Sequence, residues 1–387
     1  MSALNLKREM EKALPSDVWN ILLHCSNVAQ KNGIRIYLVG GVVRDLILSR
    51  EVFDVDITVE GNAIEFAKLL NGEIVQKQED LKTAKVRFEN GIETDFASTR
   101  KEIYPRKGHL PVVTEIGCDL QEDILRRDFT INAMALSLNA DFGDLYDYSG
   151  GFQDLKDKKL KILHDESFSD DPSRIIRGLK FSVRLGFELD EDTKFQQEKY
   201  LQNPNRDISI SRIKSELEQT FALKEPLALE IFFKNKMYRI YTDIAHSPKK
   251  FLRVPAIVSF GCILQNEMIV EDFNFTKNEK NILLKAIEFV SSYKIFDDDF
   301  ELYKFFENAE IPSVLIYYAR TGDEKALYYI ENLSNIKPLI NGNDLIDAGF
   351  LPGKQFADIF DEIIREKLIG NLQTKEEELH FLMKKKS

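Results

Sequence analysis

The sequence predicts an α+β fold, in which an N-terminal sheet domain is followed by a helical remainder. Strand-like and helix-like patterns alternate over the first third of the 387-residue chain, and strand signals become rare after Gly150-Gly151. The length also exceeds what one hydrophobic core normally fills. We therefore expect at least two modules, with a boundary near residue 150.

Each element of the N-terminal domain follows from periodicity and from the residues that interrupt it. Asn32-Gly33 stops a helix before an apolar run, Gly40-Gly41 turns that run into a second helix, and Asn62 is placed to cap a third. Predicted helices cover residues 18–30, 42–48 and 62–70, and predicted strands cover residues 34–39, 52–59, 85–88 and 92–98. The alternation of these elements predicts an α/β sheet domain.

The second part of the chain has the pattern of a series of helices. Pro172 opens one helix, and Pro204-Asn205 separates it from another that begins near Ser209. Lys337-Pro338 precedes a final helical segment. We therefore predict that the remainder is all-α.

Charge and cysteine content narrow the possible functions. The net charge of −11 argues against a protein that coats nucleic acid, so any RNA site must be a local basic patch. Cys25, Cys118 and Cys262 show no paired metal-ligand spacing and are too few for a disulfide framework. No segment has the apolar length of a membrane span. These features predict a cytoplasmic protein with no membrane partner.

An acidic pair lies on the predicted strand over residues 52–59. Asp54 and Asp56 occupy alternate positions, so both side chains should project from one face while Val55 and Ile57 point to the core. Carboxylates held this close favour a cation, and hard oxygen ligands suit Mg²⁺. Two such ions can activate an attacking hydroxyl and neutralise a leaving pyrophosphate. Taken alone, the pair is also compatible with an exposed acidic face.

The glycine turn before this strand favours the phosphate interpretation. Gly40 and Gly41 follow a strand and open a helix, where the backbone can approach a ligand closely and the helix N-terminus offers amides to a triphosphate. Arg44 lies one turn into the helix and can reach the same phosphates, and Asp45 is interpreted as its structural partner. Together with the acidic pair, this turn predicts a triphosphate site.

Residues 126–135 carry groups suited to the rest of a nucleotide. An arginine such as Arg127 can hold phosphate, and Asp128 and Asn132 can hydrogen-bond ribose hydroxyls. The alternative is a salt-bridge cluster at a helix N-terminus around a buried Phe129. Beside the acidic pair, nucleotide binding is the better prediction.

Residues 170–181 predict base recognition on a helix. Asp171, Arg174 and Arg177 recur every three residues on one polar ridge. Cytosine and adenine present an amino donor beside a ring-nitrogen acceptor, which a carboxylate at Asp171 and a guanidinium at Arg174 complement. Guanine and uracil would leave both contacts unpaired. A capped amphipathic helix without this role is the alternative.

These motifs resemble those of the class II tRNA nucleotidyltransferases and bacterial poly(A) polymerases, a family of the polymerase-β superfamily. The matching segments are residues 38–45, 54–56, 126–135, 170–174 and 209–216. The base-recognition motif departs from the family in Asp170, which replaces a glutamate, and in Lys180, which stands where the family often has arginine. The last segment resembles a helix to which we assign a supporting role.

The resemblance implies an architecture and a reaction. The fold would be a polymerase-β-like head with a mixed sheet over residues 1–150, a helical neck over 151–225, a body over 226–335 and a tRNA-binding tail over 336–387. Asp95 would be a third catalytic carboxylate beside Asp54 and Asp56, with Mg²⁺ as cofactor. The predicted nucleotide-binding residues are Gly40, Gly41, Arg44, Arg127, Asp128, Asn132, Asp171, Arg174 and Arg177.

The implied reaction adds C and A residues from CTP and ATP to the 3′ end of tRNA, without a nucleic-acid template and with release of pyrophosphate. The implied partners are tRNA, CTP and ATP, with no obligate protein partner. Complete CCA addition is the default, and addition of CC only, addition of A only and poly(A) synthesis stay open.

Functions from other classes fit less well. His164-Asp165 matches the dipeptide of metal phosphohydrolases, but the chain has five histidines and no second helix-spaced His/Asp cluster. Gly40-Gly41 lacks the third glycine of a dinucleotide-binding turn. A non-catalytic RNA-binding protein would be expected to have lost an acid of the pair or Arg174, and these residues are present.

Overall fold

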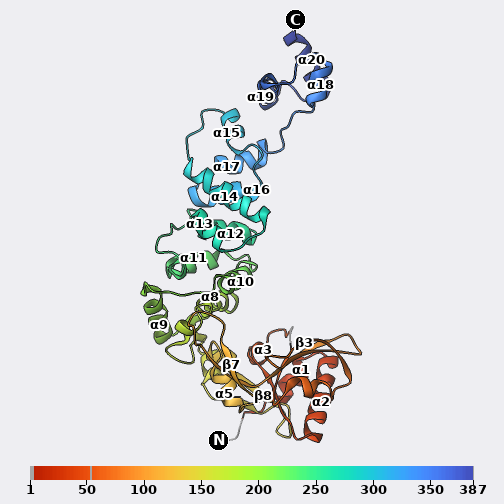
Figure 1. Cartoon of the computed structure of the whole chain (residues 1–387), viewed down its shortest axis with the longest axis vertical. Helices are drawn as coiled ribbons and strands as arrows, with labels where there is room; N and C mark the ends of the chain where they lie inside the picture. The colour runs from red at the N-terminus through yellow and green to blue at the C-terminus, as the bar shows by residue number, and fades with distance from the viewer. Residues whose placement is uncertain (1–3, 53–54, 387) are drawn as a thin grey trace. The chain divides into compact units, whose positions relative to one another are not determined.

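The computed structural model describes residues 4–52 and 55–386, and the chain divides into two compact units. The first unit contains Met1–Leu223 and Ile231–Thr242, and the second contains Lys224–Glu230 and Asp243–Ser387. Among the described residues, the strands end with β11 (Glu188–Leu189), and the rest of the chain is helical (Figure 1). The predicted α+β class is confirmed.

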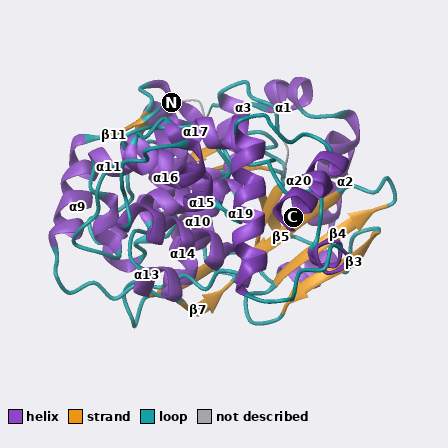
Figure 2. Cartoon of the chain, turned by 90° about the horizontal axis from the view of Figure 1, so that it is seen from above, coloured by secondary structure: helices purple, strands orange, loops and turns teal. Residues whose placement is uncertain are grey.

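A mixed sheet forms the centre of the first unit. Over the described residues its strand order is β3-β4-β5-β2-β1-β8-β9, and β2 and β5 pair parallel while the other neighbours are antiparallel. The strands are β1 (Arg35–Val39), β2 (Asp56–Glu60), β3 (Gly72–Gln78), β4 (Thr83–Phe88), β5 (Glu93–Ser98), β8 (Met134–Ser137) and β9 (Leu145–Asp147). Figure 2 shows β3, β4 and β5 side by side in orange.

Two smaller strand pairs lie outside this sheet. The hairpin of β6 (Arg100–Ile103) and β7 (Val112–Ile116) is antiparallel, and β10 (Lys159–Leu160) pairs parallel with β11. The β6–β7 hairpin contributes to the site described below, because Arg100, Glu102 and Val113 of this hairpin line its cavity.

Some helices of the first unit pack against the sheet, and others follow it along the chain. Asn62 caps α4 as predicted, since its side chain accepts hydrogen bonds from the backbone N–H groups of Ile64 and Glu65. Phe66 of α4 packs on Phe96 of β5 with ring centroids 5.8 Å apart. The helical elements are α1 (Lys7–Ala13), α2 (Ser16–Lys31), α3 (Gly41–Ile47), α4 (Ala63–Ala67), α5 (Leu120–Leu125), η1 (Thr130–Asn132), α6 (Gly151–Lys156), α7 (Ser167–Asp170), α8 (Ser173–Leu185), α9 (Glu191–Gln202), α10 (Ile210–Phe221) and η2 (Met237–Ile240).

Strands with a clear alternation or apolar run were predicted better than the others. The predicted strands 34–39, 85–88 and 92–98 correspond to β1, β4 and β5. The strand predicted over 52–59 begins only at Asp56, and Asp54 lies outside the described residues. The strands β3 and β8 were missed because β3 is mostly exposed and β8 is buried on both faces, so neither alternates.

The second unit is built from helices around an aromatic core. Phe289, Phe306 and Tyr317 pack edge to face, with ring centroids 5.0 and 5.2 Å apart for the two pairs that include Phe306. The helical elements are α12 (Ala256–Ile263), α13 (Glu267–Asp272), α14 (Lys277–Ser291), α15 (Asp299–Phe306), α16 (Ile311–Thr321), α17 (Lys325–Tyr328), η3 (Tyr329–Leu333), α18 (Gly342–Asp347), α19 (Lys354–Leu368) and α20 (Lys375–Lys386).

The helix α11 (Pro226–Lys234) is divided between the two units. The boundaries proposed at residues 150, 225 and 335 stay predictions. Within the described part of the chain, no helix combines the length and the apolar character needed to cross a bilayer.

Candidate active site

An acidic face lies where β2 begins. Asp56 is the first residue of β2 and is exposed, and it pairs in register with Asp95 of the parallel strand β5. Asp95 Oδ2 accepts a hydrogen bond from Lys85 Nζ at 2.8 Å. Cross-strand partners share a face of a sheet, so these side chains lie together. The structure thus brings together two of the three predicted acids, and Asp54 lies outside the described residues.

The acidic face suits a hard divalent cation. Asp56 and Asp95 supply carboxylate oxygens on neighbouring strands, and Mg²⁺ typically uses one or two carboxylates and completes its shell with water and substrate phosphates. The described residues contain no group of three or more His, Cys, Asp or Glu side chains placed to hold a metal by themselves. A cation here would therefore depend on ligands beyond Asp56 and Asp95.

The glycine turn has the geometry that only glycine adopts easily. Gly40 has φ 77° and ψ −133°, and α3 begins at Gly41. A side chain at Gly40 would come within 3.5 Å of Arg127 Nη1. The turn therefore leaves open backbone beside a guanidinium, as an anion site requires.

Arg44 is held more firmly than the sequence suggested. Its side chain is 4% exposed, and Nε and Nη2 donate to the two carboxylate oxygens of Asp45 at 2.9 and 2.8 Å. Its Nη1 donates to Asn132 Oδ1 at 2.7 Å. Asp45 is thus the structural partner that was expected, and Arg44 connects the glycine helix to the ribose motif. A phosphate contact by Arg44 stays a prediction.

The two arginines before Asp128 share one buried acid. Asp123 is fully buried and accepts from Arg126 Nη2 at 2.6 Å and Arg127 Nη2 at 3.0 Å. Burial opposes its ionisation, but the two guanidinium groups outweigh burial and lower the pKa of Asp123 below its ordinary value. Arg126 also pairs with Glu102 at 3.2 Å. Arg127 Nε is buried without a hydrogen-bond partner among the described residues, so it is available to an anion beside Gly40.

Asp128 and Asn132 lie together, and both side chains already make hydrogen bonds within the protein. Asp128 Oδ1 accepts from Phe129 N at 2.7 Å and from Asn132 Nδ2 at 3.1 Å, and Oδ2 accepts from Arg177 Nε at 2.7 Å. Burial works against the charge of Asp128, but Arg177 and these hydrogen bonds lower its pKa. Arg177 continues to Glu216 of α10 at 3.3 Å. A ribose hydroxyl would have to share Asp128 and Asn132 with these partners.

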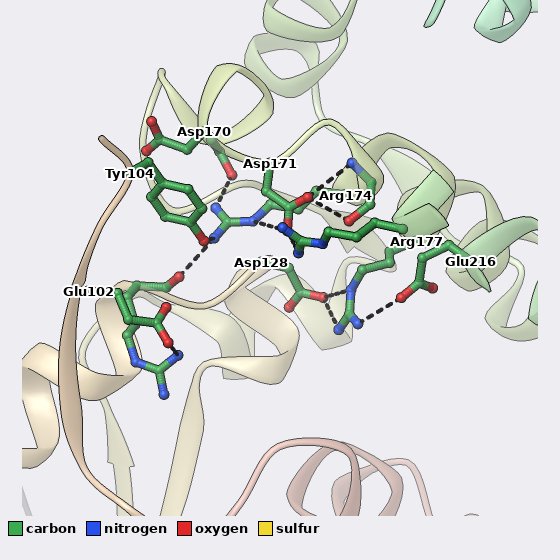
Figure 3. A network of polar contacts seen from close by, with 12 residues as sticks. Glu102, Tyr104, Asp128, Asp170, Asp171, Arg174, Arg177 and Glu216 are labelled. Atoms are coloured by element: carbon green, nitrogen blue, oxygen red, sulfur yellow. Dashed lines mark hydrogen bonds and ion pairs between the residues drawn. The ribbon is translucent and has the colours of Figure 1, made fainter. Parts of the chain in front are cut away.

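The predicted base-recognition pair, Asp171 and Arg174, is buried and lies within a network of polar contacts (Figure 3). Asp171 is 6% exposed, and its Oδ1 accepts from Ser173 N at 3.1 Å and Ser173 Oγ at 2.6 Å, while Oδ2 accepts from Arg212. Arg174 is 4% exposed and donates to Ser167 Oγ at 2.6 Å and to the Arg126 carbonyl at 2.9 Å. A longer contact of 3.4 Å joins Arg174 to Tyr104.

One expectation about this pair was wrong. Asp171 was placed on the helical ridge with Arg174, but it has an extended backbone (φ −142°, ψ 92°), and α8 begins at Ser173. Pro172 explains the break, because a proline ring disfavours helical backbone at the preceding residue. The amide and hydroxyl of Ser173 then donate to Asp171 from the first turn of the helix. Asp171 therefore lies before the helix, and Arg174 lies on it.

These groups surround one cavity of about 720 Å³ in the first unit. The predicted site residues that line it are Gly40, Gly41, Arg44, Asp56, Arg127, Asp128, Asn132, Asp171, Arg174 and Arg177. Asp95 is not among the lining residues. The cavity thus joins the glycine turn and the acidic strand to the base-recognition pair.

Several residues of the site were not predicted from the sequence. Ser167 and Ser173 contact the predicted residues Arg174 and Asp171, Glu102 pairs with Arg126, and Arg212 was assigned only a supporting role. Isolated serines and acids carry no local signal, and these contacts span up to 103 positions, as between Arg212 and the His109 carbonyl. Only the folded chain brings such partners together.

Known proteins share both the sequence motifs and the fold. A family model for the poly(A) polymerase head domain matches residues 36–161. An A-adding tRNA nucleotidyltransferase of Aquifex aeolicus is 44% identical over 54% of this chain and 26% of its own length. An A-adding tRNA nucleotidyltransferase of Geobacter sulfurreducens is 29% identical over 97% of this chain and 48% of its own length. The chain thus spans about a quarter and about half of these two relatives.

A solved structure covers the whole chain. The Thermotoga maritima CCA-adding enzyme complexed with tRNA superposes with a TM-score of 0.75 at 25% identity, with 100% of each chain covered. The sheet domain, the helical remainder and the motifs around the cavity therefore point to one family. Residues 36–161 thus match the poly(A) polymerase head domain, and the chain as a whole is similar to A-adding and CCA-adding tRNA nucleotidyltransferases in sequence and fold.

Proposed function

We propose that this protein is a nucleotidyltransferase that extends the 3′ end of tRNA from a nucleoside triphosphate and releases pyrophosphate. The observation that carries the proposal is the shared cavity: the glycine turn, Asp56 and the pair Asp171–Arg174 line the same space. A triphosphate bound at the turn would place its base toward Asp171 and Arg174, with no nucleic-acid template required.

The triphosphate would be held by the backbone and by one guanidinium. Gly40 and Gly41 offer close backbone approach at the start of α3, and Arg127 contributes the Nε atom that is buried without a described partner. Asp54, Asp56 and Asp95 are the residues that would hold Mg²⁺. The bound cation would supply activation of the 3′ hydroxyl and neutralisation of the leaving pyrophosphate.

Base selection would follow from the two buried side chains. Asp171 offers a carboxylate to an exocyclic amino group, and Arg174 offers a donor to a ring nitrogen. Because both side chains are at least nine-tenths buried, a base with the reversed pattern would place an acceptor against the Asp171 carboxylate and a donor against Arg174, which is costly. ATP and CTP are therefore the proposed substrates.

For the number of nucleotides added, we propose addition of the terminal A as the core activity. The two relatives compared above are both A-adding enzymes, which favours this activity over the default of complete CCA addition. Complete CCA addition is the second candidate, because Asp171 and Arg174 complement cytosine as well as adenine and because the Thermotoga maritima enzyme of the same fold is CCA-adding.

Product sizing on defined tRNA ends tests these alternatives. Transcripts that end at the discriminator base, at C and at CC would be incubated with CTP and ATP, separately and together. Extension of the CC end alone indicates A addition, and extension of all three ends to CCA indicates the complete activity. Absence of extension on every transcript would contradict the proposal and favour a non-catalytic RNA-binding protein.

A further inference from the structure

The acidic face carries a lysine that the reaction described above does not use. Lys85 of β4 is the register partner of Asp95 in β5, and Asp95 is the register partner of Asp56 in β2. The three residues therefore form one charged row across three neighbouring strands. We call this set the Lys85–Asp95–Asp56 row.

The row lies on the polar side of the sheet. The neighbouring row of Ala84, Phe96 and Ile57 points to the other face and is buried, with exposed fractions of 3%, 1% and 1%. Packing of Phe66 on Phe96 fixes that buried face. Because strand side chains alternate between faces, the pairing register cannot slip without burying the three charges. The position of Lys85 beside the acids is therefore set by the core.

Lys85 contacts Asp95 directly. Its Nζ donates to Asp95 Oδ2 at 2.8 Å, and the side chains are 32% and 50% exposed. Lys85 is thus a positive charge already bound to an acid of the proposed metal site. A divalent cation that used Asp95 would have to displace the ammonium group or bind close beside it, and like charges a few ångströms apart repel even in a water-like medium.

We propose that Lys85 is a positioning residue of the metal site, which holds Asp95 and weakens the binding of a divalent cation in the absence of a triphosphate. This inference rests on the proposed function of the cavity. A cation that reaches the site with a triphosphate brings phosphate oxygens as additional ligands, so it depends less on Asp95 than a bare ion does. Lys85 would thereby favour arrival of the cation together with the nucleotide.

Binding of Mn²⁺ to the full chain, without nucleotide or RNA, tests this role by calorimetry or by electron paramagnetic resonance of the free ion. We expect Lys85→Met to tighten Mn²⁺ binding by about tenfold, because a neighbouring positive charge is removed. Lys85→Arg should behave like the wild-type chain. Tightening should disappear in the double variant Lys85→Met/Asp95→Asn, since the effect passes through Asp95.

The matched control is Lys77→Met on β3. Lys77 is exposed and pairs with Glu79 at 2.9 Å, so this variant changes the net charge equally without touching the row. Unchanged or weaker Mn²⁺ binding in Lys85→Met would overturn the inference, and so would equal tightening in both variants. Persistence of the tightening in the double variant would also overturn it.

Extension assays separate this inference from the proposed function. If the wild-type chain transfers nucleotides but Lys85→Met binds Mn²⁺ with unchanged affinity, only the role of Lys85 is contradicted. If Lys85→Met binds Mn²⁺ more tightly but the wild-type chain extends no tRNA end, only the proposed nucleotidyltransferase function is contradicted.

Discussion

The acidic face, of which Asp56 lines the cavity, and the predicted base-recognition pair Asp171–Arg174 differ in how firmly their side chains are held. Asp56 is exposed, and the Lys85–Asp95 ion pair is between one-third and one-half exposed. Asp171 and Arg174 are at most 6% exposed, and each is fixed by several hydrogen bonds. The acids can thus exchange ligands with water, phosphate or a cation, whereas Asp171 and Arg174, the residues proposed to read the base, are held in fixed positions.

This difference follows from what each region would have to do. Surface ion pairs contribute little to stability, so the acidic face can bind and release ions at low cost. Discrimination between bases needs desolvated groups whose hydrogen bonds are lost with a wrong base. The two regions can be tested separately, because removal of an acid should affect catalysis, whereas removal of a fixed contact should affect selectivity or folding.

Asp56→Ala should give the largest effect. We expect the rate of transfer to fall by about 10³-fold or more, because a bound metal contributes several kcal/mol to stabilisation of charge in the transition state. Asp54→Ala is expected to act in the same way. Single-turnover extension of a CC-ended transcript with ATP measures the effect. Retained activity with an unchanged melting temperature would remove the acids from the mechanism.

Asp123→Asn should affect folding more than any change in the exposed face. It leaves the buried guanidinium groups of Arg126 and Arg127 without their charged partner, which we expect to cost about 3 kcal/mol of unfolding free energy at neutral pH. Urea denaturation measures this cost. Asp119→Asn is the control, since that side chain is 80% exposed, and an equal loss in the control would argue against the buried network.

The unfolding free energies of the wild-type chain and of Asp123→Asn should differ in their dependence on pH. The pKa of Asp123 in the folded chain lies below its ordinary value of 3.8, so its contribution is complete above the unfolded pKa and is lost as the pH falls through the folded pKa. The wild-type chain should therefore lose stability below about pH 4. Asp123→Asn should lose less unfolding free energy over that pH range. An equal slope of unfolding free energy against pH in both chains would contradict the lowered pKa of Asp123.

Asp171→Ala should reduce selectivity without a comparable loss of triphosphate binding. We expect the preference for ATP over UTP, measured as the ratio of kcat/KM values, to fall by about 10- to 100-fold, the equivalent of one or two lost hydrogen bonds. Asp170→Ala next to it is the control, because Asp170 does not line the cavity. An unchanged ratio would mean that Asp171 does not read the base.

Ser167→Ala should give the smallest effect. It removes the acceptor of Arg174 Nη1 at a fully buried position, and we expect a loss of about 1 kcal/mol of unfolding free energy. A several-fold loss of base selectivity should accompany it, because Arg174 is less firmly oriented. Ser169→Ala on the same short helix is the control. Identical selectivity in both variants would show that Arg174 is oriented by its other contacts alone.

Local patterns identified ten of the residues that line the cavity. The glycine turn, the acid at Asp56 and the pair Asp171–Arg174 are recognisable because their chemistry depends on residue types at short spacing. The helix α4 and its cap at Asn62 were predicted for the same reason. Edge strands such as β3 and fully buried strands such as β8 were missed because they lack the alternation that reveals a strand.

The α+β class, the resemblance to the nucleotidyltransferases and ten of the residues that line the cavity followed from the amino-acid sequence alone, since these are properties of short segments. The partners of these residues, in contrast, were found in the folded chain: Lys85 on Asp95, Ser167 on Arg174 and Arg212 on Asp171. The tertiary structure also placed Asp171 before the helix rather than on it. The physical reason is that register between strands and packing between helices are set by the whole core, so contacts between distant segments leave no local signal.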